Sequence, residues 1–449
     1  MQTAPAPHLA GNYAPVDKEL TAYDLPVTGQ IPPELTGWYL RNGPNPHDAA
    51  SGHWFFGDGM VHGVRLEAGR AVSYRNRWVR TSTFTDGAKV NDTGGNLDLT
   101  AGSANTHVIR HAGRTLALVE SSYPYELTRE LDTVGSYDFD GRLRTAMTAH
   151  PKTCPTSGEL HFFGYSVMGA PYLTYHRADA AGDLVLSRPI DVPAATMQHD
   201  FNLTAGHVVF MDLPVVFDLP TARSGRMPFA WDDSYGARLG VLRRDDPYGE
   251  VRWFGIDPCY VFHTLNAHDR TGPDGHDQLV LHVMRYPEFW RKDSTDVNQA
   301  TLWRWTVDLT AGTVREEQLH DRPAEFPRID DRLAGLDSRY GHATITKTPA
   351  GGAAGGTLIR YDLRDGAVSS YEFGPGRTPG EAAFAAADGH PGGDGWLMTY
   401  VYDAATDTSD LVILDAADLT APPVATIHLP TRVPFGFHGN WLADQEVPS

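Results

Sequence analysis

Short apolar runs separated by glycine-bearing turns constrain the fold of this chain more than any other feature. Examples of the runs are Thr115–Val119, His207–Met211, Gln278–Met284 and Leu411–Leu414. Each is four to seven residues long, and three of the four have Gly or Asp directly beside at least one end, as is typical of β-strands. Patterns for long amphipathic helices are scarce. The sequence therefore predicts an all-β protein.

The turns between these runs have a recurring composition. Leu66–Arg70, Phe139–Arg142, Asp308–Gly312 and Asp362–Gly366 each join strand-like segments. Glycine accepts the positive φ that a tight hairpin requires. The glycines that end the last two turns are 54 residues apart (366 − 312). Repetition at this spacing favours a β-propeller, although a sandwich or a barrel also fits.

Charge and cysteine content exclude several classes of protein. The 56 acidic and 37 basic residues give a net charge of −19, which disfavours nucleic acid as a partner. An anionic membrane offers no electrostatic attraction either, so any contact with a membrane or micelle should be apolar and transient. Two cysteines make no disulfide framework, and we see neither a signal peptide nor a long apolar run. A cytoplasmic location is expected.

Four of the 20 histidines have bulky apolar neighbours or lie in unusual local settings. They are His150, His199, His263 and His438. A histidine buried by such neighbours needs a carboxylate, a backbone group or a metal as its partner.

Local sequence does not separate these four from the rest. His62 and His342 have similar neighbours, whereas His161 is expected at the surface. Spacing alone therefore selects no ligand set.

Six motifs together resemble the carotenoid cleavage oxygenases, the family of carotenoid, apocarotenoid and stilbene oxygenases, and suggest a bacterial-type member. The match covers about 400 residues in order: Arg41–Pro46, Gly57–His62, Thr148–Lys152, Met197–Phe201, Glu325–Asp330 and Phe437–Gly439. The resemblance implies one domain over residues 1–449, with an N-terminal extension over about residues 1–30. It implies a seven-bladed β-propeller with loops that form a dome over an axial metal site.

The resemblance also assigns the metal centre. It places Fe(II) on His150, His199, His263 and His438, and it implies three glutamates that hold these rings: Glu120, Glu325 and Glu381. The family usually has proline after the last glutamate, whereas this chain has Ala382.

The spacing of the assigned residues agrees with one axial residue per blade. His199, His263, Glu325, Glu381 and His438 are separated by 64, 62, 56 and 57 residues, whereas Glu120 and His150 are only 30 apart.

Four neutral imidazoles suit Fe(II) and leave coordination positions open for O2 and substrate or water. The ligands are 49, 64 and 175 residues apart, so only a folded chain assembles them. Cys259, four residues before His263, is an alternative thiolate ligand, but a small core side chain is the better interpretation. We expect a dioxygenase that uses O2 to split a conjugated C=C bond into two carbonyl products.

Other activities remain open at this stage. A propeller that binds a ligand without oxidative chemistry and a metal-dependent isomerohydrolase both fit. The sequence indicates no oligomeric state.

The substrate branch depends on two positions. In stilbene-cleaving members a lysine precedes the first glutamate and a nearby tyrosine helps to hold a phenolic oxygen. Val119 and Phe84 occupy these positions here, which favours a polyene over a phenolic stilbene or styrene. Lys152 or Lys89 is an alternative cation for a phenolate. Met227–Trp231 resembles the segment that forms the substrate entrance, and a buried loop with an ordinary core anchor fits it equally well.

Overall fold

The computed structural model describes residues 7–47, 52–90, 97–224, 226–292, 298–345 and 355–444. Strands dominate these residues. The only α-helices among them are the short α1 (Ser82–Asp86) and α2 (Leu219–Arg223). Single 3₁₀ turns occur at Pro7–Leu9, Gly11–Tyr13, Trp54–Phe56 and Asp331–Leu333. Backbone contacts group the chain into two compact units, residues 1–137, 342–362 and 367–449, and residues 138–341 and 363–366.

Three sheets belong to the first unit. One contains, in spatial order, β1 (Leu20–Tyr23), β5 (Arg70–Trp78), β4 (Gly59–Glu67), β3 (Gly37–Pro44) and β33 (Gly439–Ala443). The second contains β6 (His107–His111), β7 (Arg114–Leu118), β8 (Tyr125–Leu127) and β9 (Thr133–Ser136). The third contains β2 (Val27–Gly29), β32 (Ala425–His428), β31 (Thr408–Asp415), β30 (Gly395–Asp403) and β28 (Arg377–Pro379), with β29 (Ala383–Ala386) also paired to β30.

The second unit contains three four-stranded sheets and one hairpin. The first sheet contains β10 (Lys152–Thr153), β11 (Leu160–Tyr165), β12 (Leu173–Ala178) and β13 (Leu184–Ile190). The next contains β14 (Asn202–Leu203), β15 (His207–Asp212), β18 (Arg238–Arg243) and β19 (Arg252–Gly255). The third contains β20 (Tyr260–Thr271), β21 (Asp277–Tyr286), β22 (Thr301–Asp308) and β23 (Thr313–Gln318), and the hairpin pairs β16 (Val215–Phe217) with β17 (Phe229–Trp231).

A seventh sheet contains β24 (Glu325–Arg328), β25 (Tyr340–Ile345), β26 (Thr357–Asp362) and β27 (Val368–Glu372). Seven antiparallel sheets of at least four strands, most built from consecutive strands, are the blades of a seven-bladed β-propeller. The predicted fold class is therefore confirmed, and the sandwich and barrel are excluded. The dome and the single-domain organisation remain predictions.

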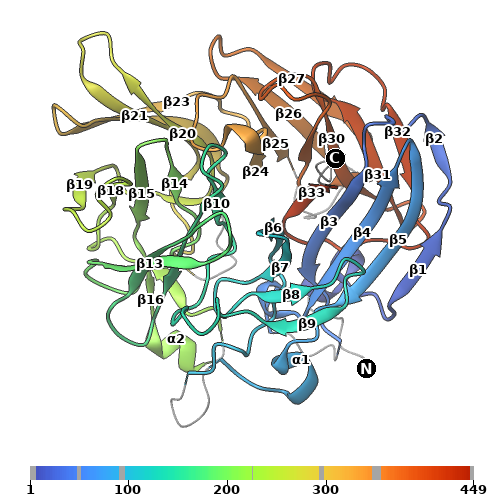
Figure 1. The fold of residues 1–449 in the computed structure, drawn as a ribbon, viewed down its shortest axis with the longest axis horizontal. Helices are drawn as coiled ribbons and strands as arrows, with labels where there is room; N and C mark the ends of the chain where they lie inside the picture. The colour runs from blue at the N-terminus through green and yellow to red at the C-terminus, as the bar shows by residue number, and fades with distance from the viewer. Residues whose placement is uncertain are drawn as a thin grey trace. The chain divides into compact units, whose positions relative to one another are not determined.

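One blade is completed by strands from opposite ends of the sequence. The N-terminal β3 lies between β4 and the C-terminal β33, where blue and red ribbons lie side by side in Figure 1. The register runs from Gly37 opposite Ala443 to Arg41 opposite Gly439. β33 thus begins one residue after His438, and the pairing fixes the backbone at that histidine.

The core consists of apolar side chains between adjacent sheets. In the second unit, Phe163 and Tyr175 from one sheet pack in a single cluster with Phe201, Phe210 and Leu242 from the next. Along β13, buried Leu184, Leu186 and Ile190 alternate with more exposed residues. This period of two is the signature of a strand with one face in the core.

Three of the four predicted turns are hairpins. Gly69, Gly312 and Gly366 have φ of 80°, 75° and 77°, and each lies between paired strands. The expectation for Phe139–Arg142 differs, because β9 ends at Ser136 and the next strand, β10, belongs to another sheet. The turn exists, but it lies in a connection between blades.

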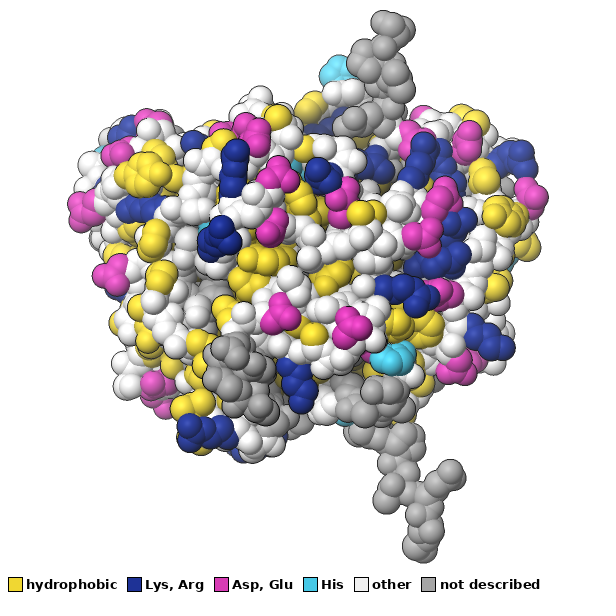
Figure 2. Space-filling view, turned by 60° about the horizontal axis from the view of Figure 1, so that its bottom comes forward, with side chains coloured by type: hydrophobic (Ala, Val, Ile, Leu, Met, Phe, Trp, Pro, Cys, Tyr) yellow, Lys and Arg dark blue, Asp and Glu magenta, His cyan; other side chains and the backbone are white. Residues whose placement is uncertain are grey.

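The surface carries both signs of charge. Lys and Arg side chains are interspersed with Asp and Glu over the face drawn in Figure 2. In the part of the chain that the structure describes, no helix has the length and apolar character needed to cross a membrane.

Candidate metal centre

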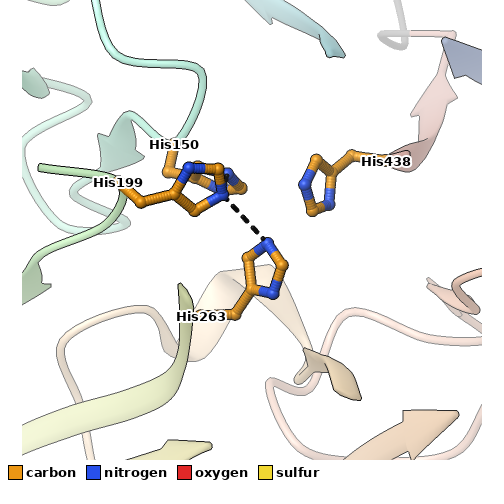
Figure 3. Close-up of side chains that lie close together, drawn as sticks. All are labelled: His150, His199, His263 and His438. Atoms are coloured by element: carbon orange, nitrogen blue, oxygen red, sulfur yellow. Dashed lines mark hydrogen bonds between the residues drawn. The ribbon is translucent and has the colours of Figure 1, made fainter. Parts of the chain in front are cut away.

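Three predicted histidines of the second unit converge on one point. The Nε2 atoms of His150 and His199 are 3.1 Å apart, and those of His199 and His263 are 3.3 Å apart, the pair joined by the dashed line in Figure 3. Each of these residues has less than one tenth of its surface exposed. Three buried ring nitrogens therefore face one another.

The segments that carry His150 and His199 are tied by Thr148. Its hydroxyl oxygen accepts a hydrogen bond from the backbone N–H of His150 at 3.1 Å and donates to the carbonyl of His199 at 3.2 Å. Both histidines lie just before short strands, His150 before β10 and His199 before β14. Thr148 thus links the two chain segments that carry His150 and His199.

His263 lies in a strand irregularity. The register between β20 and β21 shifts between Val261 and Thr264 and again between Thr264 and Asn266. Such bulges change the direction of a side chain and are common beside active sites.

Glu325, the first residue of β24, holds the other side of the His263 ring. Its Oε2 is 2.6 Å from Nδ1 of His263 and also accepts the N–H of Phe326 at 2.6 Å. A carboxylate on Nδ1 requires that nitrogen to carry the proton, which leaves the lone pair of Nε2 for a metal.

His438 of the first unit has the same arrangement with Glu381. Oε1 of Glu381 is 3.1 Å from Nδ1 of His438, and Oε2 accepts the N–H of Gly439 at 2.8 Å. The hydroxyl of Tyr39 donates to the carbonyl of Glu381 at 3.3 Å. Glu381 is only 3% exposed, so the replacement of proline by Ala382 has not turned it to the surface.

The four histidines form one buried group. Nitrogen atoms of His150, His199, His263 and His438, one from each, all lie within 4.8 Å of one another, and Figure 3 shows the rings facing a common point. Two nitrogens bound at right angles to one metal at about 2.1 Å would lie about 3.0 Å apart. The observed separations of 3.1 and 3.3 Å are close to this value, so the group has the geometry to hold a metal ion. The donor set fits Fe(II) and other first-row divalent metals.

Two other buried histidines, His62 and His161, have tyrosine hydroxyls as partners. Nδ1 of His62 is 2.8 Å from the hydroxyl of Tyr74, and burial lowers the pKa of His62. The expectation that His161 lies at the surface is wrong: it is fully buried, with Nδ1 2.6 Å from the hydroxyl of Tyr175. Burial lowers the pKa of His161 to about 3. Both residues are therefore neutral core side chains.

Cys259 does not join the group. It is fully buried, and burial raises the pKa of its thiol to about 12. The group of possible ligands within the described residues contains no sulfur atom. These features support the interpretation of Cys259 as a core residue.

The remaining predicted residues lie on identifiable elements. Glu120 and Val119 directly follow β7, Val119 being buried and Glu120 partly buried. Phe84 lies in α1, where its ring is 5.9 Å from that of Trp78 and 4.6 Å from that of His47. Their assignment to the site remains a prediction.

Sequence reasoning missed Thr148 and Tyr39. Thr148 stands two residues before His150, within the motif Thr148–Lys152. Its hydroxyl role depends on the neighbouring blade, which the local sequence does not reveal. Tyr39 contacts Glu381 across 342 residues of sequence and has no local signal at all.

Comparisons of the sequence with known proteins give a consistent result. The family model described as retinal pigment epithelial membrane protein matches residues 13–443. The chain is 40% identical to a carotenoid cleavage oxygenase of Mycobacterium tuberculosis, over 97% of both chains. It is 33% identical to carotenoid 9,10(9',10')-cleavage dioxygenase 1 of Arabidopsis thaliana, covering 99% of this chain and 91% of that protein.

Solved structures show the same fold. Lignostilbene dioxygenase of Pseudomonas brassicacearum matches with a TM-score of 0.86 and 29% identity, over 99% of this chain and 100% of that chain. Cobalt-substituted apocarotenoid oxygenase of Synechocystis matches with a TM-score of 0.83 and 27% identity, over 96% and 97% of the two chains. A β-propeller with a buried group of four histidines defines a metal-binding propeller protein. The chain belongs to the carotenoid cleavage oxygenase family and is an enzyme of the oxidoreductase class.

Proposed function

We propose that this protein is a non-haem Fe(II) dioxygenase that cleaves one C=C bond of a carotenoid or apocarotenoid with O2, giving two carbonyl products. One observation carries the proposal: the Nε2 atoms of His150 and His199 are 3.1 Å apart and those of His199 and His263 are 3.3 Å apart. Glu325 holds Nδ1 of His263 at 2.6 Å, on the opposite side of that ring. Identity of 40% to a carotenoid cleavage oxygenase supports the reaction class.

Each residue of the site has a defined task in this proposal. His150, His199, His263 and His438 hold the metal, while Glu325 and Glu381 fix two of the rings and offset the buried positive charge. Glu120 is assigned the same task. Iron(II), when bound, supplies the activation of O2, and this reaction needs no acid or base from the chain.

Apolar residues at the two positions assigned to the substrate pocket, Val119 and Phe84, favour a polyene as the substrate. Val119 is 8% exposed and offers no donor to a phenolate, and Phe84 offers only a ring. Lys152 lies 2.8 Å from the carboxylate of Asp200, and Lys89 is exposed. An unpaired phenolate would be costly to bury in such a site.

A phenolic stilbene or styrene is the second candidate. Similarity to a lignostilbene dioxygenase over the whole chain supports it.

The substrate entrance is assigned to the segment around β17. Phe229 and Trp231 are partly buried, and the Phe229 ring packs 5.9 Å from Phe217 and 6.5 Å from Tyr165. An apolar hairpin of this kind suits transient contact with a membrane or micelle. Both cysteines are free and buried, which supports a reducing, cytoplasmic location.

Metal content and oxygen consumption test the proposal. Protein reconstituted anaerobically with Fe(II) should consume O2 with an apocarotenoid and release two carbonyl products in equal amounts. The variant His263→Ala, which loses one nitrogen of the group, is the matched control. Iron-loaded protein that consumes no O2 with any polyene or stilbene would refute the dioxygenase assignment.

A further inference from the structure

A single carboxylate lies at the centre of the three ligand segments of the second unit. Asp200 directly follows His199 and is 2% exposed. Its Oδ1 is 2.8 Å from Nζ of Lys152 and accepts the N–H of Phe201 at 2.8 Å. Its Oδ2 accepts the N–H of Thr264 at 2.9 Å and the hydroxyl of Thr264 at 3.2 Å. Both oxygens of a buried side chain are thus fully used.

The partners of Asp200 all neighbour metal ligands. Lys152 is two residues after His150 and begins β10, while Thr264 is the residue after His263 in β20. Asp200 itself comes between His199 and β14. The carboxylate therefore joins the three segments that present His150, His199 and His263, and it does so without touching the metal position.

The irregularity in β20 makes one of these bonds possible. Register shifts on both sides of Thr264 interrupt the regular ladder with β21 at this residue. The N–H of Thr264 donates to Asp200, and the Thr264 hydroxyl also approaches the carbonyl of Phe201 at 3.4 Å. A buried N–H needs such a partner, so the bulge that directs His263 is stabilised by the segment that carries His199.

We propose that Asp200 is a positioning residue that sets the separations of the His150, His199 and His263 Nε2 atoms. Those separations, 3.1 and 3.3 Å, suit one metal ion, and each depends on the relative placement of adjacent blades. The proposal rests on the metal centre of the proposed function, but not on its substrate.

Asp200→Asn is the decisive substitution, because it keeps the shape of the side chain and removes the charge that faces Lys152. The asparagine amide also carries two donors where the carboxylate had only acceptors, so one of the bonds to Phe201 and Thr264 is lost. Residues that orient metal ligands typically contribute about 10- to 100-fold in metal affinity. We expect a loss of this size in Co(II) affinity and an altered visible spectrum of the Co(II) protein, which reports coordination geometry.

Asp212→Asn is the matched control. Asp212 is fully buried in β15, which pairs with β14 in the sheet that follows Asp200. It accepts the hydroxyl of Tyr235 at 2.7 Å and pairs with Arg238 at 2.9 Å. The substitution Asp212→Asn should lower the melting temperature of the metal-free protein about as much as Asp200→Asn does. It should leave the Co(II) affinity and the Co(II) spectrum unchanged. This pattern separates positioning of the ligands from general stability.

Two results would overturn the proposal. One is wild-type Co(II) affinity and spectrum in Asp200→Asn, and the other is an equal effect of Asp212→Asn on both. If Asp200→Asn does not fold, Lys152→Met removes the cation alone and should alter the Co(II) spectrum in folded protein; an unchanged spectrum would refute the role. Co(II) binding needs no substrate. If the polyene assay fails, the proposed reaction is rejected, but the Co(II) affinity and spectrum of the Asp200 variant still test the positioning role.

Discussion

The two glutamates that hold His263 and His438 differ in how their oxygens are used, and this difference predicts unequal effects of the same substitution. Oε2 of Glu325 serves both His263 and the N–H of Phe326. Glu381 uses Oε1 for His438 and Oε2 for the N–H of Gly439. A glutamine has one acceptor oxygen, so at position 325 it can keep the bonds to both His263 and Phe326, whereas at position 381 it can satisfy only one of the two donors.

The magnitudes follow from these contacts. Glu325→Gln loses the charge but keeps the bonds to His263 and Phe326. Hydrogen bonds to a charged group are stronger than neutral ones by about 1 kcal/mol, which corresponds to roughly fivefold in metal affinity. Glu381→Gln has the same loss and also places an amide N–H₂ against a buried donor, which adds about 1–3 kcal/mol. The combined cost is about 2–4 kcal/mol, or roughly 30- to 1000-fold.

Two measurements check this order. Chelator competition gives the affinity for Fe(II) or Co(II), and thermal unfolding of the metal-free protein gives the stability. Both are needed, because the glutamine oxygen of Glu381→Gln can turn to His438, which costs stability, or to Gly439, which costs metal affinity. For each variant, the loss of metal-binding free energy is added to the loss of unfolding free energy. If this sum is as large for Glu325→Gln as for Glu381→Gln, the argument from oxygen usage is refuted.

Three further predictions concern the ligands, the entrance and the substrate. His263→Ala should lose metal and activity together while the blades stay folded, as shown by circular dichroism; full iron content with normal turnover would refute the ligand assignment. Phe229→Ser combined with Trp231→Ser should reduce cleavage of a micellar substrate more than that of a water-soluble one, whereas equal loss would identify an ordinary packing role. In competition at equal iron loading, a carotenoid polyene should be cleaved in preference to a 4-hydroxystilbene; cleavage of the stilbene alone would reverse the substrate assignment.

The all-β character was predictable because it depends on local chemistry, whereas the seven-bladed propeller was expected from the family resemblance. Runs such as His207–Met211 and turns with Gly69, Gly312 or Gly366 carry their own strand and hairpin signals. Local chemistry also has a limit, which Phe139–Arg142 illustrates: it forms a turn with positive φ at Gly141 but connects different sheets. A turn motif specifies its own backbone and not the pairing of the strands beside it.

The histidine set could not be chosen by the same reasoning. His62 and His161 are as well buried as His150 and His263, yet each faces a tyrosine hydroxyl. What distinguishes a ligand is the position of its ring nitrogen in the folded chain, and family resemblance supplied that information. Asp200 and Thr148 escaped notice because their partners belong to neighbouring blades.

The pairing of β3 with β33 determines how late in synthesis the sheet that contains them can be completed. A ribosome synthesises β33 after every other described strand, and His438 only one residue before it. Until then the nascent chain already contains His150, His199 and His263, but β3 has an unpaired edge. Closure of that sheet and synthesis of the last proposed ligand, His438, therefore coincide. A fragment that stops before residue 438 should lack both the complete β1–β5–β4–β3–β33 sheet and tight metal binding.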